Sequence, residues 1–206
     1  MGRFKNIFLI LISWIPINTL RVFLYKALGF QIGRNVKVGF RTTLICGTCV
    51  IGDYAYIGNK THINGKKIEI GARTRIGNNN KLIAWANYVK NELNSNYIKI
   101  GEDCMITEGH MLDGSFGLEI GDKTWIGDRN SSLWSHGSTC KPGPIIIGKR
   151  CYIGSDVKIG TNVVIGDEVL VAMGSVVVRG CQSKCIIAGL PATVKRENYL
   201  WYEHWS

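Results

Sequence analysis

Four histidines are the side chains best suited to acid–base chemistry near neutral pH, because imidazole changes protonation state there. They are His62, His110, His136 and His204. His204 lies in an aromatic tail and His62 in a regular repeat turn, so surface or packing roles are expected for both. His136 stands at the last position before a six-residue repeat breaks, and it is followed by a glycine. This position makes His136 the candidate general base among the four, although a lone histidine is more often structural.

A second polar cluster lies close to one repeat coil before His136. The segment Gly109-His-Met-Leu-Asp-Gly114 places His110 three residues before Asp113. His110 could orient His136, bind an acceptor or fill a turn. We expect it to have a role in the active site.

An Ile-Gly repeat organises the chain. The last four Ile-Gly pairs follow one another at six-residue steps, and steps of 19 residues separate Ile32, Ile51 and Ile70. A six-residue unit makes one short strand and one turn, so three units form a triangular coil whose aliphatic residues point inward. The following glycine lies where a Cβ would collide. Six is not a multiple of 3.6, which excludes a helical period. The repeat predicts an all-β fold, a parallel β-helix over residues 32–180.

The repeat is interrupted at three places, and loops that leave a rigid solenoid commonly carry function. We expect insertion loops near residues 84–98 and 137–146, and a two-residue excess surrounds Phe116-Gly117. Residues 181–206 are expected to form a C-terminal tail.

Residues 1–31 are predicted to be a short helical segment. The apolar run Ile7–Ile15 is ended by Pro16 before it could span a bilayer, and no small-residue cleavage site follows. Residues 17–29 place Leu20, Phe23, Leu24, Ala27 and Leu28 on one helical face. Two interpretations stay open: a helix that caps the core, or peripheral membrane contact through an interfacial helix.

The formal net charge of +10 favours an acidic partner, such as a nucleotide cofactor or an anionic lipid. We expect no nucleic-acid partner, because zinc-finger spacing, a recognition-helix pattern and a basic stripe with aromatics are missing from the sequence. The seven scattered cysteines favour reduced thiols in a cytoplasmic protein, at most peripheral at the inner face of the membrane. Cys46-Gly-Thr-Cys49 and Cys181-Gln-Ser-Lys-Cys185 could suggest a zinc site, but the second spacing is loose and a long segment separates the pairs, so we expect no metal.

Two stretches, Ile120-Gly-Asp-Lys-Thr-Trp-Ile-Gly through Leu-Trp-Ser-His136, and Ile147-Gly to Ala188-Gly-Leu-Pro-Ala and Arg196, carry a family resemblance. They resemble the left-handed β-helix acyltransferases of the hexapeptide-repeat superfamily, especially its maltose, galactoside and exopolysaccharide O-acetyltransferases. The resemblance covers residues 32–196. The left-handed sense of the β-helix is inferred from this resemblance alone. It implies transfer of acetyl from acetyl-CoA to a saccharide hydroxyl in cell-surface polysaccharide biosynthesis. It also implies a homotrimer with sites between subunits and no metal.

The same resemblance assigns roles to single residues. His136 becomes the catalytic base, Asp113 and Trp134 bind the acceptor, and the backbone N–H of Ser155 polarises the thioester carbonyl. The coenzyme A contacts that it implies are Tyr152, Ser155, Met173, Arg179 and Arg196, the arginines suiting its phosphates.

Three other functions remain as alternatives. A sugar-nucleotide N-acetyltransferase uses the same chemistry, although several relatives carry an N-terminal nucleotide-binding unit for which residues 1–31 leave no room. A β-helix carbonic anhydrase would need two histidines five residues apart, which the sequence lacks. A non-catalytic β-helix scaffold would use the loops as partner contacts. Acceptor identity, regiochemistry and acyl length stay open.

Overall fold

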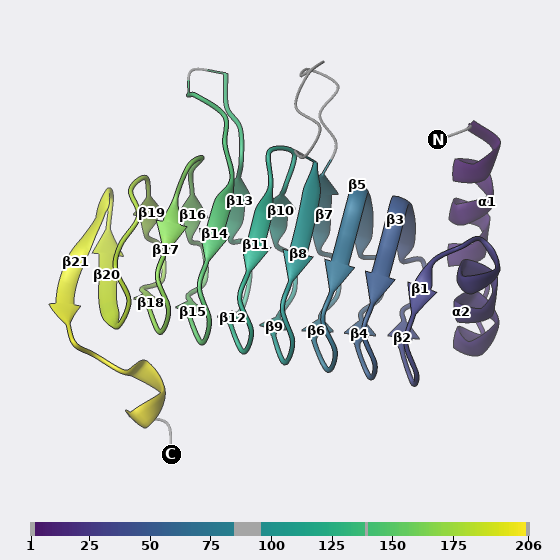
Figure 1. The fold of residues 1–206 in the computed structure, drawn as a ribbon, viewed down its shortest axis with the longest axis horizontal. Helices are drawn as coiled ribbons and strands as arrows, with labels where there is room; N and C mark the ends of the chain where they lie inside the picture. The colour runs from purple at the N-terminus through teal and green to yellow at the C-terminus, as the bar shows by residue number, and fades with distance from the viewer. Residues whose placement is uncertain (1–2, 85–95, 139, 205–206) are drawn as a thin grey trace.

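The computed structural model describes residues 3–84, 96–138 and 140–204, and its strands wind into stacked triangular coils with three walls (Figure 1). The first wall is a sheet in the order β2-β4-β6-β9-β12-β15-β18-β20-β21, and the other two walls share a second sheet. Each successive pair along the coil axis is parallel, up to β20, whose partner β21 is antiparallel. The predicted β-helix fold is confirmed.

The strands are short and recur wall by wall. The first wall contains β2 Lys37–Val38, β4 Tyr56–Ile57, β6 Arg75–Ile76, β9 Met105–Ile106, β12 Trp125–Ile126, β15 Tyr152–Ile153, β18 Leu170–Val171, β20 Cys185–Gly189 and β21 Ala192–Glu197. The second wall contains β1 Gln31–Ile32, β8 Tyr97–Ile100, β11 Leu118–Ile120, β14 Ile145–Ile147 and β17 Val164–Ile165. The third wall contains β7 Lys81–Ala84, β10 Met111–Asp113, β13 Ser132–Trp134, β16 Lys158–Ile159 and β19 Val176–Val177. Two longer strands, β3 Thr43–Ile51 and β5 His62–Ile70, run through the third and second walls.

The aliphatic residue of each repeat fills the interior, as the period required. Within the two-residue strands the first residue faces outward and the second is buried, because side chains alternate along a strand. Stacked coils thus bury continuous aliphatic columns, among them Ile57, Ile76, Ile106, Ile126 and Ile153. This burial is the main source of stability of the solenoid.

The glycine of an Ile-Gly pair is required by the next coil. A Cβ added to Gly148 would lie 2.6 Å from the carbonyl carbon of Gly166, closer than real Cβ atoms come. The corner itself bends two residues later, where Arg150 adopts φ 52. Tyr54, at the same position after Gly52 in an earlier coil, adopts φ 60. The collision expected from the sequence is therefore real, but the left-handed backbone conformation belongs to a different residue.

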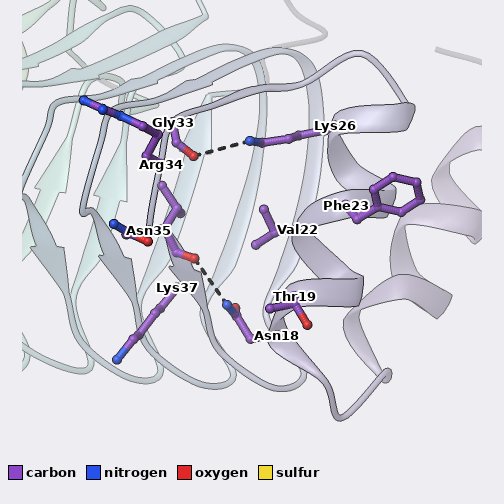
Figure 2. A pocket seen from close by; sticks show the side chains of 10 residues that line it. Asn18, Thr19, Val22, Phe23, Lys26, Gly33, Arg34, Asn35 and Lys37 are labelled. Atoms are coloured by element: carbon purple, nitrogen blue, oxygen red, sulfur yellow. Dashed lines mark hydrogen bonds between the residues drawn. The ribbon is translucent and has the colours of Figure 1, made fainter.

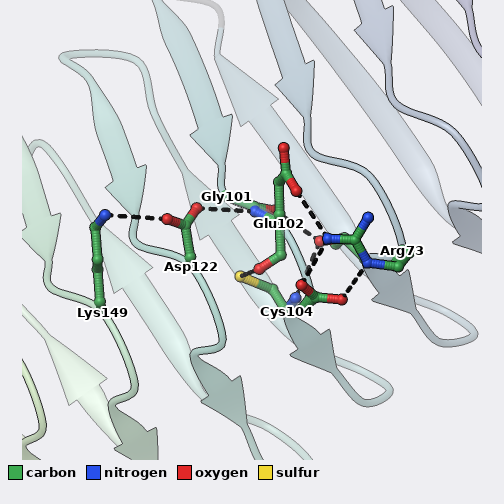
Figure 3. A network of polar contacts seen from close by, with 8 residues as sticks. Arg73, Gly101, Glu102, Cys104, Asp122 and Lys149 are labelled. Atoms are coloured by element: carbon green, nitrogen blue, oxygen red, sulfur yellow. Dashed lines mark hydrogen bonds and ion pairs between the residues drawn. The ribbon is translucent and has the colours of Figure 1, made fainter.

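Polar ladders tie neighbouring coils together at the corner between the second and first walls (Figure 3). Arg73 donates to Asp103 at 2.6 Å and to Glu102 at 2.8 Å, across one coil step. Asp122 accepts the Glu102 amide at 3.0 Å and pairs with Lys149 at 3.1 Å. These side chains are exposed, so each ion pair adds little stability, and the backbone contacts fix the coil register.

Two helices, α1 (Arg3–Ser13) and α2 (Asn18–Ala27), lie over the first coil (Figure 1). Asn18 donates to Val36 O at 3.2 Å and accepts from Val38 N at 2.9 Å, and Arg21 donates to Val38 O. These side chains satisfy backbone groups that the first coil would leave unpaired at its edge. The helices therefore cap the solenoid. None of the described helices is long and apolar enough to cross a membrane.

The C-terminal part continues the coil and then folds back. β20 pairs in parallel with β18, so the coiled region extends to Gly189, beyond the boundary at residue 180 drawn from the sequence. A short 3-10 helix, η1 (Trp201–His204), returns to the first wall, where Trp201 Nε1 donates to Arg150 O at 2.6 Å. Of the two loops expected from the sequence, the one near residues 84–98 falls mostly on residues 85–95, which lie outside the described residues. The loop after β13 projects away from the coils (Figure 1).

Candidate active site

His136 lies at the corner between the third and second walls, two residues after β13 ends and at the start of the projecting loop. One coil earlier, Asp113 ends β10 and stands beside Trp134 in the parallel register. His136 Nδ1 and Asp113 Oδ2 are 2.7 Å apart. The broken repeat thus brings an imidazole and a carboxylate into direct contact.

Asp113 is held by an unusually complete set of donors. Its Oδ2 accepts the Ser135 N–H at 3.0 Å and the Ser135 hydroxyl at 2.8 Å, besides the His136 contact. Its Oδ1 accepts the Ser115 N–H at 3.1 Å and the Ser115 hydroxyl at 2.6 Å. The carboxyl group is 1% exposed. A carboxylate accepts hydrogen bonds, so the nitrogen of His136 that contacts Asp113, Nδ1, carries the proton. The lone pair of Nε2 is then left to accept a proton.

The ring of His136 is accessible, with 39% of its side chain exposed. Phe116 lies on one side with its ring centre 6.1 Å away, and the Trp134 ring stands edge-on at 6.3 Å. Trp134 is itself 43% exposed. An accessible imidazole with a fixed tautomer and aromatic walls can take a proton from a hydroxyl group placed against it.

His110 is enclosed instead. It is 1% exposed, its Nε2 lies 3.0 Å from Thr107 Oγ1, and its Nδ1 accepts the Ser131 N–H at 3.2 Å. Burial lowers the pKa of His110 to about 4. These contacts are those of a neutral histidine that fills a coil corner, and the partner that reaches His136 is Asp113. The catalytic role expected for His110 has no contact with His136 to support it and stays a prediction.

Ser115, Ser135 and Phe116 also belong to this candidate site, and none of them was predicted from the sequence as a site residue. Ser135 links the two coils, since its hydroxyl donates to Asp113 and accepts the Phe116 N–H at 3.0 Å. The sequence did carry one signal for them. The two-residue excess at Phe116-Gly117 marks where the earlier coil bonds to Ser135 of the later one.

Ser155 lies at the other edge of the third wall, in the corner between β15 and β16. At this type of corner the amides of Phe40 and Asn59 are each capped, at 2.8 Å, by an asparagine side chain of the next coil. The residue stacked on Ser155 in the next coil is Met173, which has no side-chain oxygen. The Ser155 N–H is thus at a corner where that cap is missing, beside a methionine that is 75% exposed.

The other residues expected to bind coenzyme A are spread over the C-terminal coils. Tyr152 packs against Trp125 at 5.5 Å and Trp201 at 5.4 Å on the first wall. Arg179 is exposed after β19. Arg196 is exposed on β21 with its guanidinium group 4.7 Å from the Tyr199 ring. Ser155 and Met173 are therefore the two of this set that the coil stacking brings together.

No group of three or more His, Cys, Asp or Glu side chains that could hold a metal ion occurs among the described residues. The described cysteines are free thiols, and most of them are buried in the core.

The comparisons with known proteins agree with the repeat. Residues 144–179 match the family "Bacterial transferase hexapeptide (six repeats)". A polysialic acid O-acetyltransferase of Escherichia coli O1:K1 / APEC is 32% identical over 144 residues, which are 70% of this chain. The chain belongs to the hexapeptide-repeat transferases. It spans 41% of the length of that curated relative.

Solved structures of hexapeptide-repeat proteins share the fold. A hexapeptide-repeat acetyltransferase from Vibrio cholerae O1 biovar eltor, complexed with acetyl coenzyme A, superposes with a TM-score of 0.52 at 22% identity, covering 95% of this chain and 86% of that one. A mutant N-acyltransferase from Bacillus cereus, in complex with dTDP and coenzyme A, gives a TM-score of 0.55 at 17% identity, covering 88% and 92%. At these identities, the likeness between this chain and the two solved structures concerns the fold alone.

Proposed function

We propose that this chain is an acetyl-CoA-dependent O-acetyltransferase that modifies a hydroxyl group of a cell-surface saccharide. The observation that carries the proposal is the contact between buried Asp113 and accessible His136. It makes Nε2 a proton acceptor without any metal ion. The kinship with an O-acetyltransferase of polysialic acid supports a saccharide acceptor.

In the proposed reaction, His136 Nε2 takes the proton of the acceptor hydroxyl as its oxygen attacks the thioester carbonyl. Asp113 stabilises the imidazolium that forms, because its carboxylate lies on Nδ1. The tetrahedral oxyanion accepts the Ser155 N–H. Collapse of this intermediate breaks the C–S bond, and the imidazolium returns its proton to the departing thiolate, giving the acetyl ester and free coenzyme A.

One chain holds His136 and Ser155 at opposite edges of the third wall. The strands between these corners span on the order of 10 Å, at about 3.3 Å per residue. One thioester carbonyl cannot reach both groups across that distance. We therefore propose that the site forms between two copies, with His136 from one and Ser155 from the other, as expected for a homotrimer.

The buried free thiols support a reducing compartment, and we place the protein in the cytoplasm, where acetyl-CoA is also available. Tyr152, Met173, Arg179 and Arg196 remain the proposed coenzyme A contacts. Trp134, exposed beside His136, is the proposed acceptor platform, because a flat aromatic ring packs well against a sugar face.

The function is tested by incubating the protein with acetyl-CoA and oligosaccharides, and following free thiol release together with acetylated product. We expect thiol release that depends on the acceptor, and a product whose acetyl group is removed by alkaline hydroxylamine, as oxygen esters are. A hydroxylamine-resistant product would show N-acylation instead. Absence of coenzyme A binding by titration calorimetry would favour the non-catalytic scaffold and overturn the proposal.

A further inference from the structure

Helix α2 turns part of its apolar face outward, although Leu24 and Leu28 pack partly against the core. Its buried residues are Arg21, at 4% exposure, and Tyr25, whereas Leu20 and Phe23 are 42% and 65% exposed. Figure 2 shows Asn18 and Lys26 reaching toward the first coil, while Phe23 lies on the side of the helix away from it. The capping contacts of Asn18 and Arg21 turn these polar residues toward the coil, which leaves Leu20 and Phe23 exposed.

Helix α1 and the turn after it extend the same surface. Leu9 and Ile12 are buried in the core, while Phe8 is 62% and Leu11 59% exposed. Phe8 and Leu11 line a groove of about 370 Å³ between the helices, and all its lining residues are apolar. We call the exposed set the apolar cap face; it comprises Ile7, Phe8, Ile10, Leu11, Trp14, Ile17, Leu20 and Phe23.

The charge of the chain segment that forms this face is positive. The first 52 residues contain seven Lys and Arg and no Asp or Glu, although the whole chain carries 15 acidic residues. Lys26, Arg34 and Lys37 line a cleft of about 450 Å³ between α2 and the first coil, next to Phe23 (Figure 2). Arg34 pairs with Asp53, whereas Lys26 and Lys37 form no ion pair with any residue of the described ranges.

Trp14 lies where the apolar cap face meets a basic side chain. Its ring is 53% exposed, packs edge-on against Phe40 at 6.1 Å, and carries the Arg41 guanidinium group 4.4 Å from its centre. Tryptophan with a neighbouring cation is typical of the level of lipid headgroups, where one end of the side chain is apolar and the other wet.

We propose that the apolar cap face docks the protein on an anionic lipid surface, with Phe8, Leu11 and Phe23 entering the headgroup–acyl boundary and Lys26 and Lys37 meeting lipid phosphates. A second copy of the chain would place Lys26 and Lys37 of one cap against those of the other, which disfavours self-association through this face. An anionic bilayer satisfies both the apolar area and the charge. The docking is independent of the acyl transfer proposed for His136.

The test is co-sedimentation of the full chain with protein-free vesicles. We expect binding to phosphatidylcholine vesicles that contain about one quarter phosphatidylglycerol, and much weaker binding to phosphatidylcholine alone. Raising the salt to about 0.5 M should weaken binding to the anionic vesicles by about tenfold or more, because the phosphate contacts are screened. A protein that stays in the supernatant with anionic vesicles at low salt would overturn the proposal.

Variants separate the surface from the fold. The double variant Phe8→Ser/Phe23→Ser should bind the anionic vesicles at least about tenfold more weakly, since two large apolar side chains are removed from the boundary. The matched control Val164→Ser/Val178→Ser alters valines 53% and 54% exposed on the β-helix, and should bind like the unaltered protein. Circular dichroism and thermal unfolding verify that both pairs stay folded.

Charge and self-association give two further outcomes. Lys26→Glu/Lys37→Glu should lower binding to anionic vesicles by about tenfold or more while leaving the apolar face intact. If Phe8→Ser/Phe23→Ser binds vesicles normally but changes the molar mass in light scattering, the face joins copies of the chain and the lipid proposal is wrong. These variants should release coenzyme A thiol from acetyl-CoA at an unchanged rate when a soluble acceptor is supplied. This result separates the lipid proposal from the proposed function.

Discussion

His136 Nδ1 lies 2.7 Å from Asp113 Oδ2, although the two residues are 23 positions apart and belong to successive coils. The carboxylate is buried and accepts from both flanking serines, whereas the imidazole is accessible. A buried acceptor on Nδ1 fixes which nitrogen can act as a base. This relationship places the candidate active site at the interruption of the repeat.

Asp113→Asn should lower kcat/KM for acetyl transfer by about a hundredfold or more. The amide would either turn an N–H toward Nδ1, which moves the imidazole proton to Nε2, or oppose the Ser115 donors. Asp122→Asn, which alters an exposed ion pair, is the matched control and should keep full activity. Steady-state kinetics at saturating acetyl-CoA makes the comparison. Full activity of Asp113→Asn would contradict the assigned tautomer.

His110 should make stability depend on pH. Its ordinary pKa of 6.5 is lowered to about 4 by burial, so the unfolded chain binds a proton first as the pH falls. The contribution of neutral His110 to the free energy of unfolding is fully present above about pH 6.5. It is lost progressively as the pH falls to about 4, and the total loss is about 3 kcal/mol. Urea unfolding across this range measures it.

His110→Asn keeps an acceptor near the position of Nδ1 and should flatten that pH dependence. It should leave acetyl transfer within about tenfold of the unaltered protein, since the ring does not contact His136. A loss of activity as large as that of Asp113→Asn, with an unchanged pH dependence of stability, would restore the catalytic role expected from the sequence.

The Ser155 backbone rather than its side chain should serve the reaction. Ser155→Ala keeps the N–H and should change kcat by less than about threefold, whereas Ser155→Pro removes it and should lower kcat by about a hundredfold. Thermal unfolding checks that the proline variant is folded. Equal rates for the two variants would exclude the amide as an oxyanion donor.

Mixing two inactive chains tests whether the site is shared. Co-expressed His136→Ala and Ser155→Pro chains should regain about a quarter of the activity, because one interface in four pairs an intact His136 with an intact Ser155. Either variant alone provides the background rate. A mixture no more active than its components would place both groups in one chain.

Coil stacking predicts opposite outcomes for two glycines. Gly148→Ala should destabilise the fold by several kcal/mol, because its Cβ would meet the backbone of Gly166 at 2.6 Å, while the nearest atom to a Cβ at Gly160 is 3.6 Å away. Gly160→Ala should change the free energy of unfolding by less than about 1 kcal/mol. Chemical denaturation of both variants decides.

The repeat made the walls, the inward aliphatic columns and the position of His136 predictable, because a six-residue period admits one side chain per unit inward. The partner of His136 was not predictable in the same way. Asp113 was expected to meet an acceptor, and its contact with Nδ1 joins two successive coils. Such a contact depends on three-dimensional packing between coils, which the repeat does not specify.

The orientation of α2 was hidden for a different reason. Its helical period identifies the apolar face that contains Leu20 and Phe23, but the end of a β-helix presents unpaired backbone groups. Asn18 and Arg21 satisfy Val36 and Val38 there, so the polar face turns inward. The usual rule that the apolar face of a helix turns inward does not hold here, because the surface under α2 presents unpaired backbone N–H and C=O groups.

The central claim is that His136 is the base. The direct measurement is kcat for acetyl transfer by His136→Ala, with the dissociation constant of coenzyme A measured on the same sample. The account predicts a loss in kcat of about a thousandfold or more with coenzyme A affinity unchanged within about twofold, because only the proton transfer is removed. A folded His136→Ala variant that retains the full kcat would contradict the account.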